Sequence, residues 1–378
     1  MNICKIESHE VPDGHRIQAL ISEEGPGRGR EFYVETNLPV ELSEAANGFL
    51  LASYLPAMDR GERELTIEGE VCPKLVSNLS LVASIMQGWF RKTGEPPEVI
   101  GSLRKSVPSA GVGIFLSGGV DSMYSLMELT ERLPLGHPLR PTFAVLIDYR
   151  EASLSDAQAH SRFDESFQRC QRIADSVGIE LAWVRTNLRA LRLGGDFWTR
   201  RYHGAMLASI AHFLSGTGGR FYIASSSSKG ADVPWGSHPM LDPLYSSCRM
   251  EICHHGVELS KFDKIGELVK ANEMIQHLQV CTAKTDTGTN CGRCKKCLRT
   301  KLYLAVNGAD WALSAFDYES ISREDICSIP IKRDQMYGIY CYLLENMRKR
   351  GSVDPVWIDE LDRKLKKYKR WRFLRSGN

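Results

Sequence analysis

The sequence predicts an α/β protein whose centre is a doubly wound parallel sheet. Between residues 111 and about 285, short apolar runs alternate with helical patterns, as expected for a sheet with helices on both faces. The first run, residues 112–116, ends abruptly in the sequence S-G-G-V-D-S at 117–122, and a helical pattern follows at once. A strand, a glycine turn and a helix in this order direct backbone N–H groups and the positive end of a helix dipole at an anion.

Composition sets loose bounds on the class of protein. At 378 residues the chain is long enough for two domains. Its 43% apolar and 25% charged residues are ordinary for a soluble globular protein. A net charge of +2 does not by itself indicate a nucleic-acid partner. The sequence has no run of 18 apolar residues and no signal-peptide pattern, so we expect no membrane segment. Eleven mostly scattered cysteines fit a reducing compartment, and we expect a cytoplasmic protein.

Residues 1–105 are expected to form a small α+β accessory module without a catalytic motif. Strand-like runs at 2–7, 16–22, 31–36 and 65–68 are broken by turn sequences at 12–14 and 25–27. One helical pattern follows Ser43, and a second runs over about 74–89. Two roles remain open for the module: packing or dimerisation in a homo-oligomer, or recruitment of a substrate or partner protein.

The central domain is expected at 106–305, with further strands at 143–147, 181–184 and 221–224 and with helices between them. Ligands of such sheets lie at the carboxyl ends of the strands. The site should therefore contain the 117–122 loop, Asp148 and Tyr149, and the polar run after Ala224.

The 117–122 loop has the chemistry of a polyphosphate site. Its residues are Ser117, Gly118, Gly119, Val120, Asp121 and Ser122. Adjacent glycines let the main chain approach an anion, and the two hydroxyls add donors. Asp121 cannot bind phosphate itself, but its carboxylate is suited to holding Mg²⁺ beside one. The loop lacks the G-K-[ST] of a Walker A motif. The alternative is an ordinary glycine turn.

Two further segments offer ligand-binding side chains. After residue 224, Trp235 could stack on a planar ligand, Asp232 and Asp242 could accept ring N–H groups, and Lys229 could meet a carboxylate or phosphate. A rigid loop with turn-capping aspartates is the alternative. Lys261 and Lys264 open an amphipathic helix after a Ser260 cap. They are either on a solvated face or within reach of a triphosphate.

Four cysteines, Cys281, Cys291, Cys294 and Cys297, have the C-x9-C-x2-C-x2-C spacing of a metal knuckle. Four thiolates complete a tetrahedral Zn²⁺ site with no open position, which indicates structural zinc. An iron–sulfur cluster or a redox dithiol remains open. The nearby residues Cys253, His254 and His255 are expected to be ordinary loop residues. Arg299 follows the last cysteine, and a metal could hold it toward the active site.

The S-G-G-V-D-S loop, together with Cys281 and C-G-R-C-K-K-C-L-R at 291–299, resembles the 7-cyano-7-deazaguanine synthase family. That family belongs to the PP-loop ATP pyrophosphatase superfamily, whose fold is of the adenine nucleotide α-hydrolase type. The resemblance covers roughly residues 111–305. It implies that ATP adenylates the carboxylate of 7-carboxy-7-deazaguanine with loss of pyrophosphate. Ammonia then displaces AMP to give an amide, and a second adenylation dehydrates the amide to the nitrile.

The chain also departs from that family. Tyr149 is followed by Arg150-Glu151 instead of a Tyr-Gly-Gln turn, and W-G-S-H-P-M-L-D-P at 235–243 replaces an aromatic-Pro-Asp-Cys segment. The family's simple members lack the first ~100 and last ~70 residues. Extended relatives occur in bacterial antiphage systems, where the activated deazaguanine can be joined to an amine on a protein. The final product is therefore open between amide, nitrile and protein conjugate.

Residues 306–378 are expected to form a helical extension with a basic tail. Eight Lys or Arg residues lie between 363 and 375, interleaved with Tyr368, Trp371 and Phe373. Such a tail either binds RNA or is a solvated cationic helix. Two other functions remain alternatives to the adenylating C–N ligase. One is a tRNA-modifying enzyme of the same superfamily, and the other is a non-catalytic nucleotide-binding scaffold with a vestigial loop.

Overall fold

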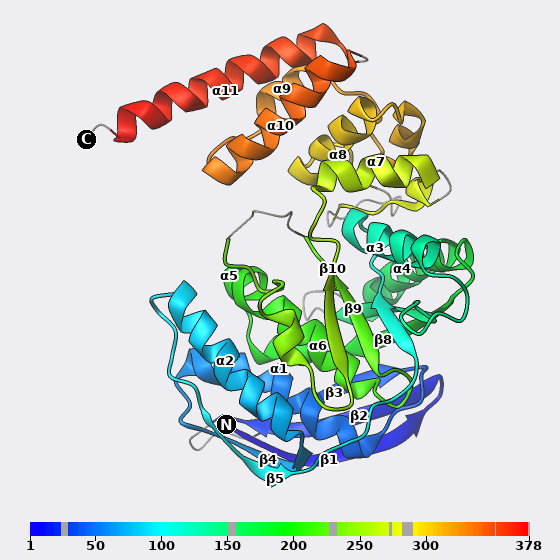
Figure 1. Cartoon of the computed structure of the whole chain (residues 1–378), viewed down its shortest axis with the longest axis vertical. Helices are drawn as coiled ribbons and strands as arrows, with labels where there is room; N and C mark the ends of the chain where they lie inside the picture. Colours follow the sequence, from blue (N-terminus) through cyan, green and yellow to red (C-terminus); the bar gives the residue numbers. More distant parts are fainter. Residues whose placement is uncertain are drawn as a thin grey trace. The chain divides into compact units, whose positions relative to one another are not determined.

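A ten-stranded sheet runs through residues 1–258 of the computed structural model (Figure 1). The structure describes residues 1–23, 29–149, 156–226, 233–271, 274–281, 290–351 and 353–376. The strand order is β10-β9-β6-β7-β8-β3-β2-β1-β4-β5. The strands are β1 (Asn2–Val11), β2 (Gly14–Ser22), β3 (Arg30–Thr36), β4 (Glu64–Val71), β5 (Glu98–Leu103), β6 (Val112–Phe115), β7 (Phe143–Tyr149), β8 (Glu180–Thr186), β9 (Arg220–Ala224) and β10 (Glu251–His255).

One half of the sheet confirms the expected parallel arrangement. Strands β8, β7, β6, β9 and β10 are neighbours in that order, and every pair among them is parallel. The chain starts this half at β6, moves outward through β7 and β8, and then returns to the other side of β6 with β9 and β10. The direction of winding thus reverses between β6 and β9, and in such sheets a crevice opens there at the carboxyl ends of the strands.

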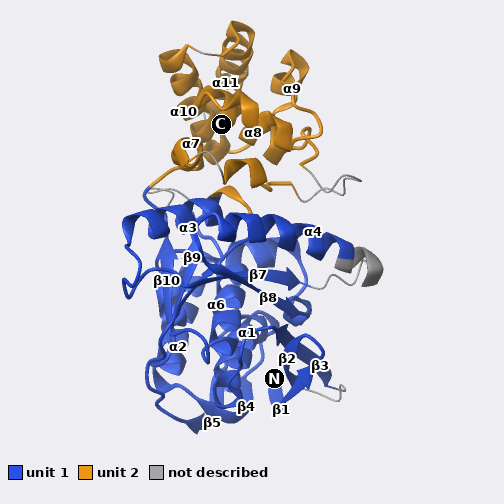
Figure 2. Ribbon diagram, turned by 90° about the vertical axis from the view of Figure 1, so that its right-hand side faces the viewer, with its two compact units in different colours: residues 1–117, 121–258 blue, residues 118–120, 259–378 orange. Residues whose placement is uncertain are grey.

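The N-terminal strands continue the same sheet, so residues 1–105 do not form a unit of their own. Strand β3 pairs antiparallel with β8, with Val34 opposite Thr186. Two compact units result: a first unit of residues 1–117 and 121–258, and a second unit of residues 118–120 and 259–378 (Figure 2). These limits differ from the boundaries at 105 and 305 expected from the sequence. The physical reason is that the N-terminal strands form backbone hydrogen bonds with the edge of the parallel half of the sheet. Such pairing between distant segments cannot be predicted from composition or from local sequence patterns.

Helices cover both faces of the sheet in the first unit. Helices α1 (Ala45–Arg60), α2 (Pro73–Trp89) and α6 (His203–Phe213) lie on one face, and α3 (Val120–Arg132) and α4 (Asp156–Asp175) lie on the other (Figure 1). The short α5 (Gly195–Phe197) precedes α6. Helix α1 is apolar on all sides and almost wholly buried, as expected for a helix packed between layers. Its Phe49 ring contacts the Phe213 ring of α6 edge-on at 4.7 Å between centroids.

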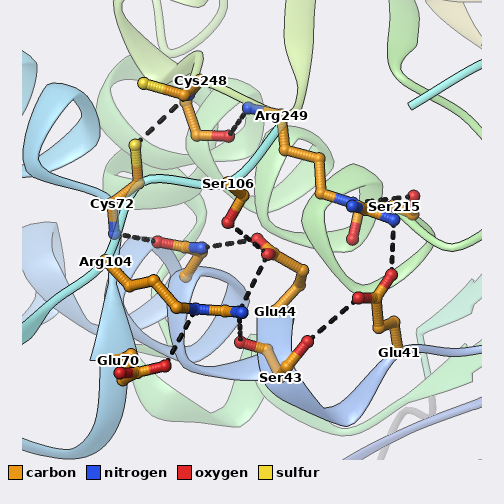
Figure 3. A network of polar contacts seen from close by, with 12 residues as sticks. Glu41, Ser43, Glu44, Glu70, Cys72, Arg104, Ser106, Ser215, Cys248 and Arg249 are labelled. Atoms are coloured by element: carbon orange, nitrogen blue, oxygen red, sulfur yellow. Dashed lines mark hydrogen bonds and ion pairs between the residues drawn. The ribbon is translucent and has the colours of Figure 1, made fainter. Parts of the chain in front are cut away.

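A polar network also joins the N-terminal segment to the parallel half of the sheet (Figure 3). The buried Glu44 accepts hydrogen bonds from Arg104, Ser106 and Asn47 at 2.5–3.1 Å. Asn47 Oδ1 in turn accepts the Cys72 amide at 2.8 Å, and Cys72 Sγ accepts the Cys248 amide at 3.2 Å. These contacts link β4 and α2 to the segment before β10, so the two halves of the first unit share polar contacts as well as a core.

The second unit is helical around the cysteine segment. Its helices are α7 (Lys261–Ala271), α8 (Lys295–Val306), α9 (Arg323–Ser328), α10 (Asp334–Arg350) and α11 (Pro355–Ser376). The expected Ser260 cap of α7 is present, since Ser260 Oγ accepts the Asp263 amide at 3.2 Å. Within the described ranges, none of the helices combines the length and apolarity needed to cross a membrane.

Candidate functional site

The 117–122 loop follows β6 at the point where the sheet reverses its winding. The Leu116 amide still donates to Val145 of β7 at 2.9 Å, and the chain then leaves the sheet. Gly118 has a φ of 71°, a left-handed conformation that favours glycine. Ser122 Oγ accepts the Ser117 amide and lies 3.2 Å from Ser117 Oγ. These contacts hold the turn closed before the first turn of α3, so the expected strand, turn and helix are all present.

The loop is partly accessible. Ser117 is exposed, Gly119 and Asp121 are half-buried, and Gly118 and Ser122 are buried. Asp121 lies in the first turn of α3. The loop thus offers a hydroxyl, main-chain amides at the start of a helix, and a carboxylate on one short segment. This donor set suits an anion with an accompanying cation.

Asp148 and Tyr149 are the last two residues of β7, as expected, and both are half-buried. The Tyr149 ring packs edge-on against Trp198, with 5.2 Å between centroids. Its hydroxyl is buried without a hydrogen-bond partner among the described residues, and burial raises the pKa of Tyr149. Tyr149 therefore stays neutral, and its buried hydroxyl is suited to donating a hydrogen bond to a ligand.

The loop after β9 was expected to bind a ligand, and the structure describes only part of it. Lys229 and Asp232 lie outside the described residues. Trp235 is half-buried, and its ring contacts His203 at 6.0 Å between centroids. Asp242 is fully buried, with one oxygen accepting from Ser237 Oγ at 2.6 Å and the other accepting from the His238 amide at 3.3 Å. With its oxygens occupied inside the protein, Asp242 positions the loop and is not placed to accept a ligand's ring N–H groups.

Two histidines of β10 were expected to be loop residues, and this expectation is wrong. Because side chains alternate along a strand, His254 and His255 point to opposite faces of the sheet. His255 contacts Ser125 Oγ and Glu128 of α3, each at 3.0 Å. His254 Nδ1 lies 2.7 Å from Asp242 Oδ2, and its Nε2 is buried with no partner among the described residues. The sequence signal was weak because β10 is a short edge strand with one buried apolar residue, Ile252.

Lys261 and Lys264 lie in the first turn of α7 with unequal exposure. Lys261 is half-buried, whereas Lys264 is 1% exposed. The solvated-face interpretation therefore fails for Lys264. Both lysines belong to the second unit, as do the four cysteines and Arg299.

The four cysteines form a compact group that fits a tetrahedral metal. All four sulfurs lie within 4.8 Å of one another. Neighbouring Sγ atoms are 3.4 Å apart for Cys281–Cys291 and Cys294–Cys297, and 3.8–3.9 Å apart for Cys281–Cys294 and Cys291–Cys297. Sulfurs ~2.3 Å from a central Zn²⁺ would be roughly 3.8 Å apart. These separations are too long for disulfides and close to those of a metal-thiolate tetrahedron.

Backbone amides support the thiolate state. The Cys294 and Cys297 amides point at Cys291 Sγ and Cys294 Sγ, at 3.4 and 3.5 Å. Burial raises the pKa of Cys291, but amides of Arg293 and Cys294 and the neighbouring thiols outweigh it and lower the pKa to about 7. The turn that aims these amides passes through Gly292, whose φ is 70°. A Cβ at Gly292 would lie 2.6 Å from the Tyr318 carbonyl oxygen, so only glycine fits.

One residue of this centre was missed by the sequence analysis. Asn290 is 1% exposed, and its Oδ1 accepts the amides of Val280 and Cys281 at 2.8 and 3.1 Å. Its Nδ2 donates to Leu278 and Ala315 at 2.8 and 2.9 Å. Asn290 thus ties the segment carrying Cys281 to the segment carrying the other three cysteines. An asparagine directly before a metal knuckle is the signal that could have identified it.

Arg299 lies on α8, two residues after Cys297, and is half-buried. Its Nε is buried without a hydrogen-bond partner among the described residues. Burial raises the pKa of Tyr303 and of Tyr340, and the nearby positive charge of Arg299 only partly opposes this. An unpaired guanidinium nitrogen in this position keeps Arg299 a candidate for binding an anion.

Comparison with known proteins gave no match: no family model, no curated protein and no solved structure is significantly similar to this chain.

Proposed function

We propose that this chain is an ATP-dependent, adenylating C–N ligase that activates the carboxylate of a 7-deazaguanine-type substrate, 7-carboxy-7-deazaguanine. The observation that carries the proposal is the position of the 117–122 loop, which connects β6 to α3 beside the point of reversed winding. It brings main-chain amides, the exposed Ser117 hydroxyl and the Asp121 carboxylate to the edge where parallel sheets bind ligands.

In the proposed first step, a substrate carboxylate oxygen attacks the α-phosphorus of ATP. The bond between that phosphorus and the bridging oxygen to the β-phosphorus breaks, and pyrophosphate leaves. The loop amides and the Ser117 hydroxyl stabilise the charge on the leaving pyrophosphate. Asp121 holds Mg²⁺, which neutralises the polyphosphate. No side-chain nucleophile is needed, because the carboxylate is the nucleophile and the acyl adenylate is the activated product.

In the proposed second step, an amine attacks the acyl carbon, AMP leaves, and the amine loses a proton. The acceptor is ammonia, which leads to an amide or nitrile, or an amine on a protein, which leads to a conjugate as in an antiphage system. Arg299 is proposed to meet the anionic part of the substrate. The four-cysteine centre is proposed to bind zinc as a structural ion, since four protein ligands leave no open position.

The test is release of pyrophosphate and AMP from ATP with 7-carboxy-7-deazaguanine, with and without ammonia, followed by mass spectrometry. We expect pyrophosphate release from the wild-type protein and its loss by at least ~100-fold in Ser117→Ala and Asp121→Asn, since each removes charge stabilisation in the transition state. Ser84→Ala is the matched control, because the exposed Ser84 bonds, among the described residues, only to Ser80 of its own helix.

The products distinguish the outcomes. A nitrile or primary amide supports the synthase reaction. Adenylation without conversion by ammonia indicates a macromolecular amine as acceptor. Absence of any substrate-dependent pyrophosphate release would contradict the proposal.

A further inference from the structure

Helix α11 carries an unbalanced positive charge that the proposed ligase reaction does not use. Residues 363–375 contain eight Lys or Arg and no Asp or Glu, although the whole chain has a net charge of only +2. Along the described part of this stretch, the basic side chains are exposed or half-buried. A solvated helix would explain charge alone, so the question is whether the surface around it has the shape of a binding site.

A cavity of about 510 Å³ opens at the C-terminal half of α11. It is lined by Ile331, Lys332, Lys364, Lys367, Tyr368 and Trp371. Three of these residues are lysines, two are aromatic and none is acidic. A cavity with this lining suits a ligand that is both anionic and planar.

The aromatic residues form a stack that ends at the surface. The rings of Tyr337 and Tyr368 are stacked, with 5.3 Å between centroids and 27° between planes, and Trp371 continues the row at 5.6 Å and 36°. Tyr368 is 8% exposed and Trp371 is 45% exposed. The row therefore ends in an accessible indole on which one more planar group can stack.

Three acidic residues on or beside α11 already pair with basic residues. Glu360 pairs with Arg323 and Arg363, Asp362 pairs with Arg348 and Lys366, and Asp334 pairs with Arg372. Lys364 donates to the Cys327 carbonyl. Among the described residues, Lys332 and Lys367 have no acidic partner, and the same holds for Lys369 and Arg370 farther along α11. Their positive charge is available to an incoming anion.

We propose that this surface binds single-stranded nucleic acid, with a base stacked on Trp371 and the flanking phosphates against Lys332 and Lys367. A stacking face beside lysines is the arrangement that holds single strands without a sequence requirement. Residues 363–375 carry eight basic side chains, more positive charge than a single nucleotide neutralises, which favours a strand. An acidic peptide would use the charges but not the indole face, and a duplex offers no unstacked base. This site is independent of the proposed ligase reaction.

The test is fluorescence anisotropy of a labelled 20-nucleotide oligouridylate with the full-length protein at several salt concentrations. We expect Trp371→Ala to weaken binding on the order of 10-fold through loss of stacking. The double variant Lys332→Gln/Lys367→Gln should make the slope of log K against log salt shallower by roughly 1.4, which corresponds to two phosphate contacts on a single strand. Lys270→Gln is the control, because Lys270 is exposed on α7 and pairs with Glu267.

Circular dichroism of each variant checks that the fold is kept, which the exposure of Trp371 and both lysines leads us to expect. Unchanged binding in both Trp371→Ala and Lys332→Gln/Lys367→Gln would overturn the site. Equal affinity for a duplex of the same length would overturn the stacking role. Tighter binding of a polyglutamate peptide that also depends on Lys332 and Lys367 would replace nucleic acid by an acidic protein partner.

Discussion

At the cysteine centre, a single amide side chain connects the two segments that supply the sulfurs. Asn290 makes four hydrogen bonds to main-chain groups, and all four use the fixed geometry of one planar amide. No other side chain of similar size offers two acceptor lone pairs and two donors in this arrangement except glutamine, which is one methylene longer. The position of Cys281 relative to the other three cysteines therefore depends on Asn290.

Replacing Asn290 by alanine should weaken both the fold around the centre and its metal affinity. The change leaves two amides and two carbonyls unpaired in a buried site, and we expect a loss of roughly 2–4 kcal/mol in the free energy of unfolding of the second unit. Zinc affinity should fall roughly 10- to 100-fold, as for lost outer-shell partners. Urea unfolding and competition with a zinc chelator measure the two effects. Asn346→Ala is the control, since the side chain of Asn346 lies at the surface and, within the part of the chain that the structure describes, bonds only to Tyr342 of its own helix. Wild-type protein that contains less than about one zinc per chain would contradict the assignment.

A buried histidine makes the first unit sensitive to acid. Burial lowers the pKa of His212 to about 4 from an ordinary value of 6.5, and the bond to the Tyr245 carbonyl at 2.8 Å only partly opposes this. The folded protein keeps His212 neutral below pH 6.5, whereas the unfolded chain binds the proton. Stability from this residue is therefore complete above pH 6.5 and is lost as the pH falls toward 4, with a loss of about 2 kcal/mol at pH 5.

His212→Gln removes the titrating group and keeps an N–H donor. We expect the wild type to lose about 2 kcal/mol more than the variant between pH 7.5 and pH 5, measured by urea unfolding of the first unit at each pH. Parallel losses in the two proteins would show that the His212 pKa is not lowered in the fold.

At the scale of elements, the local patterns predicted most helices and strands, while their pairing needed the structure. The apolar spacing of residues 46–54 predicted a helix, and α1 is there, but the pattern did not show that both sides of it are buried. The hairpin between β1 and β2 follows from its Pro-Asp-Gly turn.

Strand β10 was missed because an edge strand with two histidines lacks the apolar run on which the prediction relied. The cysteine spacing predicted the four residues that lie close enough to hold a metal ion, but Asn290 acts through tertiary contacts that no spacing rule contains.

Two helical glycines give opposite predictions for the same substitution. A Cβ on Gly48 of α1 would lie 2.6 Å from the ring of Phe213, which is fully buried in α6. Gly48→Ala should therefore destabilise the first unit by about 1–3 kcal/mol through overpacking. Gly88 near the end of α2 is exposed and has open space around its Cβ position. Gly88→Ala should stabilise the protein by about 0.5–1 kcal/mol, because alanine loses less backbone entropy on folding.

Urea midpoints of the two variants and the wild type compare them directly. A double variant supplies a second check. Replacing the Phe213 ring by the smaller leucine side chain makes room for the added Cβ, so Gly48→Ala combined with Phe213→Leu should recover part of the stability lost in Gly48→Ala. No destabilisation by Gly48→Ala would contradict the close packing between α1 and α6, and destabilisation by Gly88→Ala would contradict the open space around the Gly88 Cβ position.

At the scale of the whole molecule, the N-terminal strands and helices share the sheet and the core of the first unit, and we expect its folding to depend on them. The sequence predicted a separable module at 1–105, but β3 forms the neighbour of β8 and α1 covers the buried face of α6. Without residues 1–105, buried side chains of α6 that α1 now covers, such as Phe213, would face water. At about 1.5–3 kcal/mol for each such side chain, the loss is comparable to the whole stability of a typical domain.

A truncated chain of residues 106–378 should therefore fail to form the native first unit, although it contains the complete 117–122 loop and the four cysteines. We expect weak near-ultraviolet circular dichroism, binding of a hydrophobic dye and no cooperative melting transition for this unit. Residues 1–105 supplied as a separate chain should restore these signals, because the missing contacts are non-covalent. The second unit provides an internal reference, since its cysteine centre lies within residues 259–378 and should still bind zinc in the truncated chain. A cooperative transition of the truncated chain alone would mean that the parallel strands are stable without the N-terminal segment, and the sequence-based division at residue 105 would then be the correct description of folding.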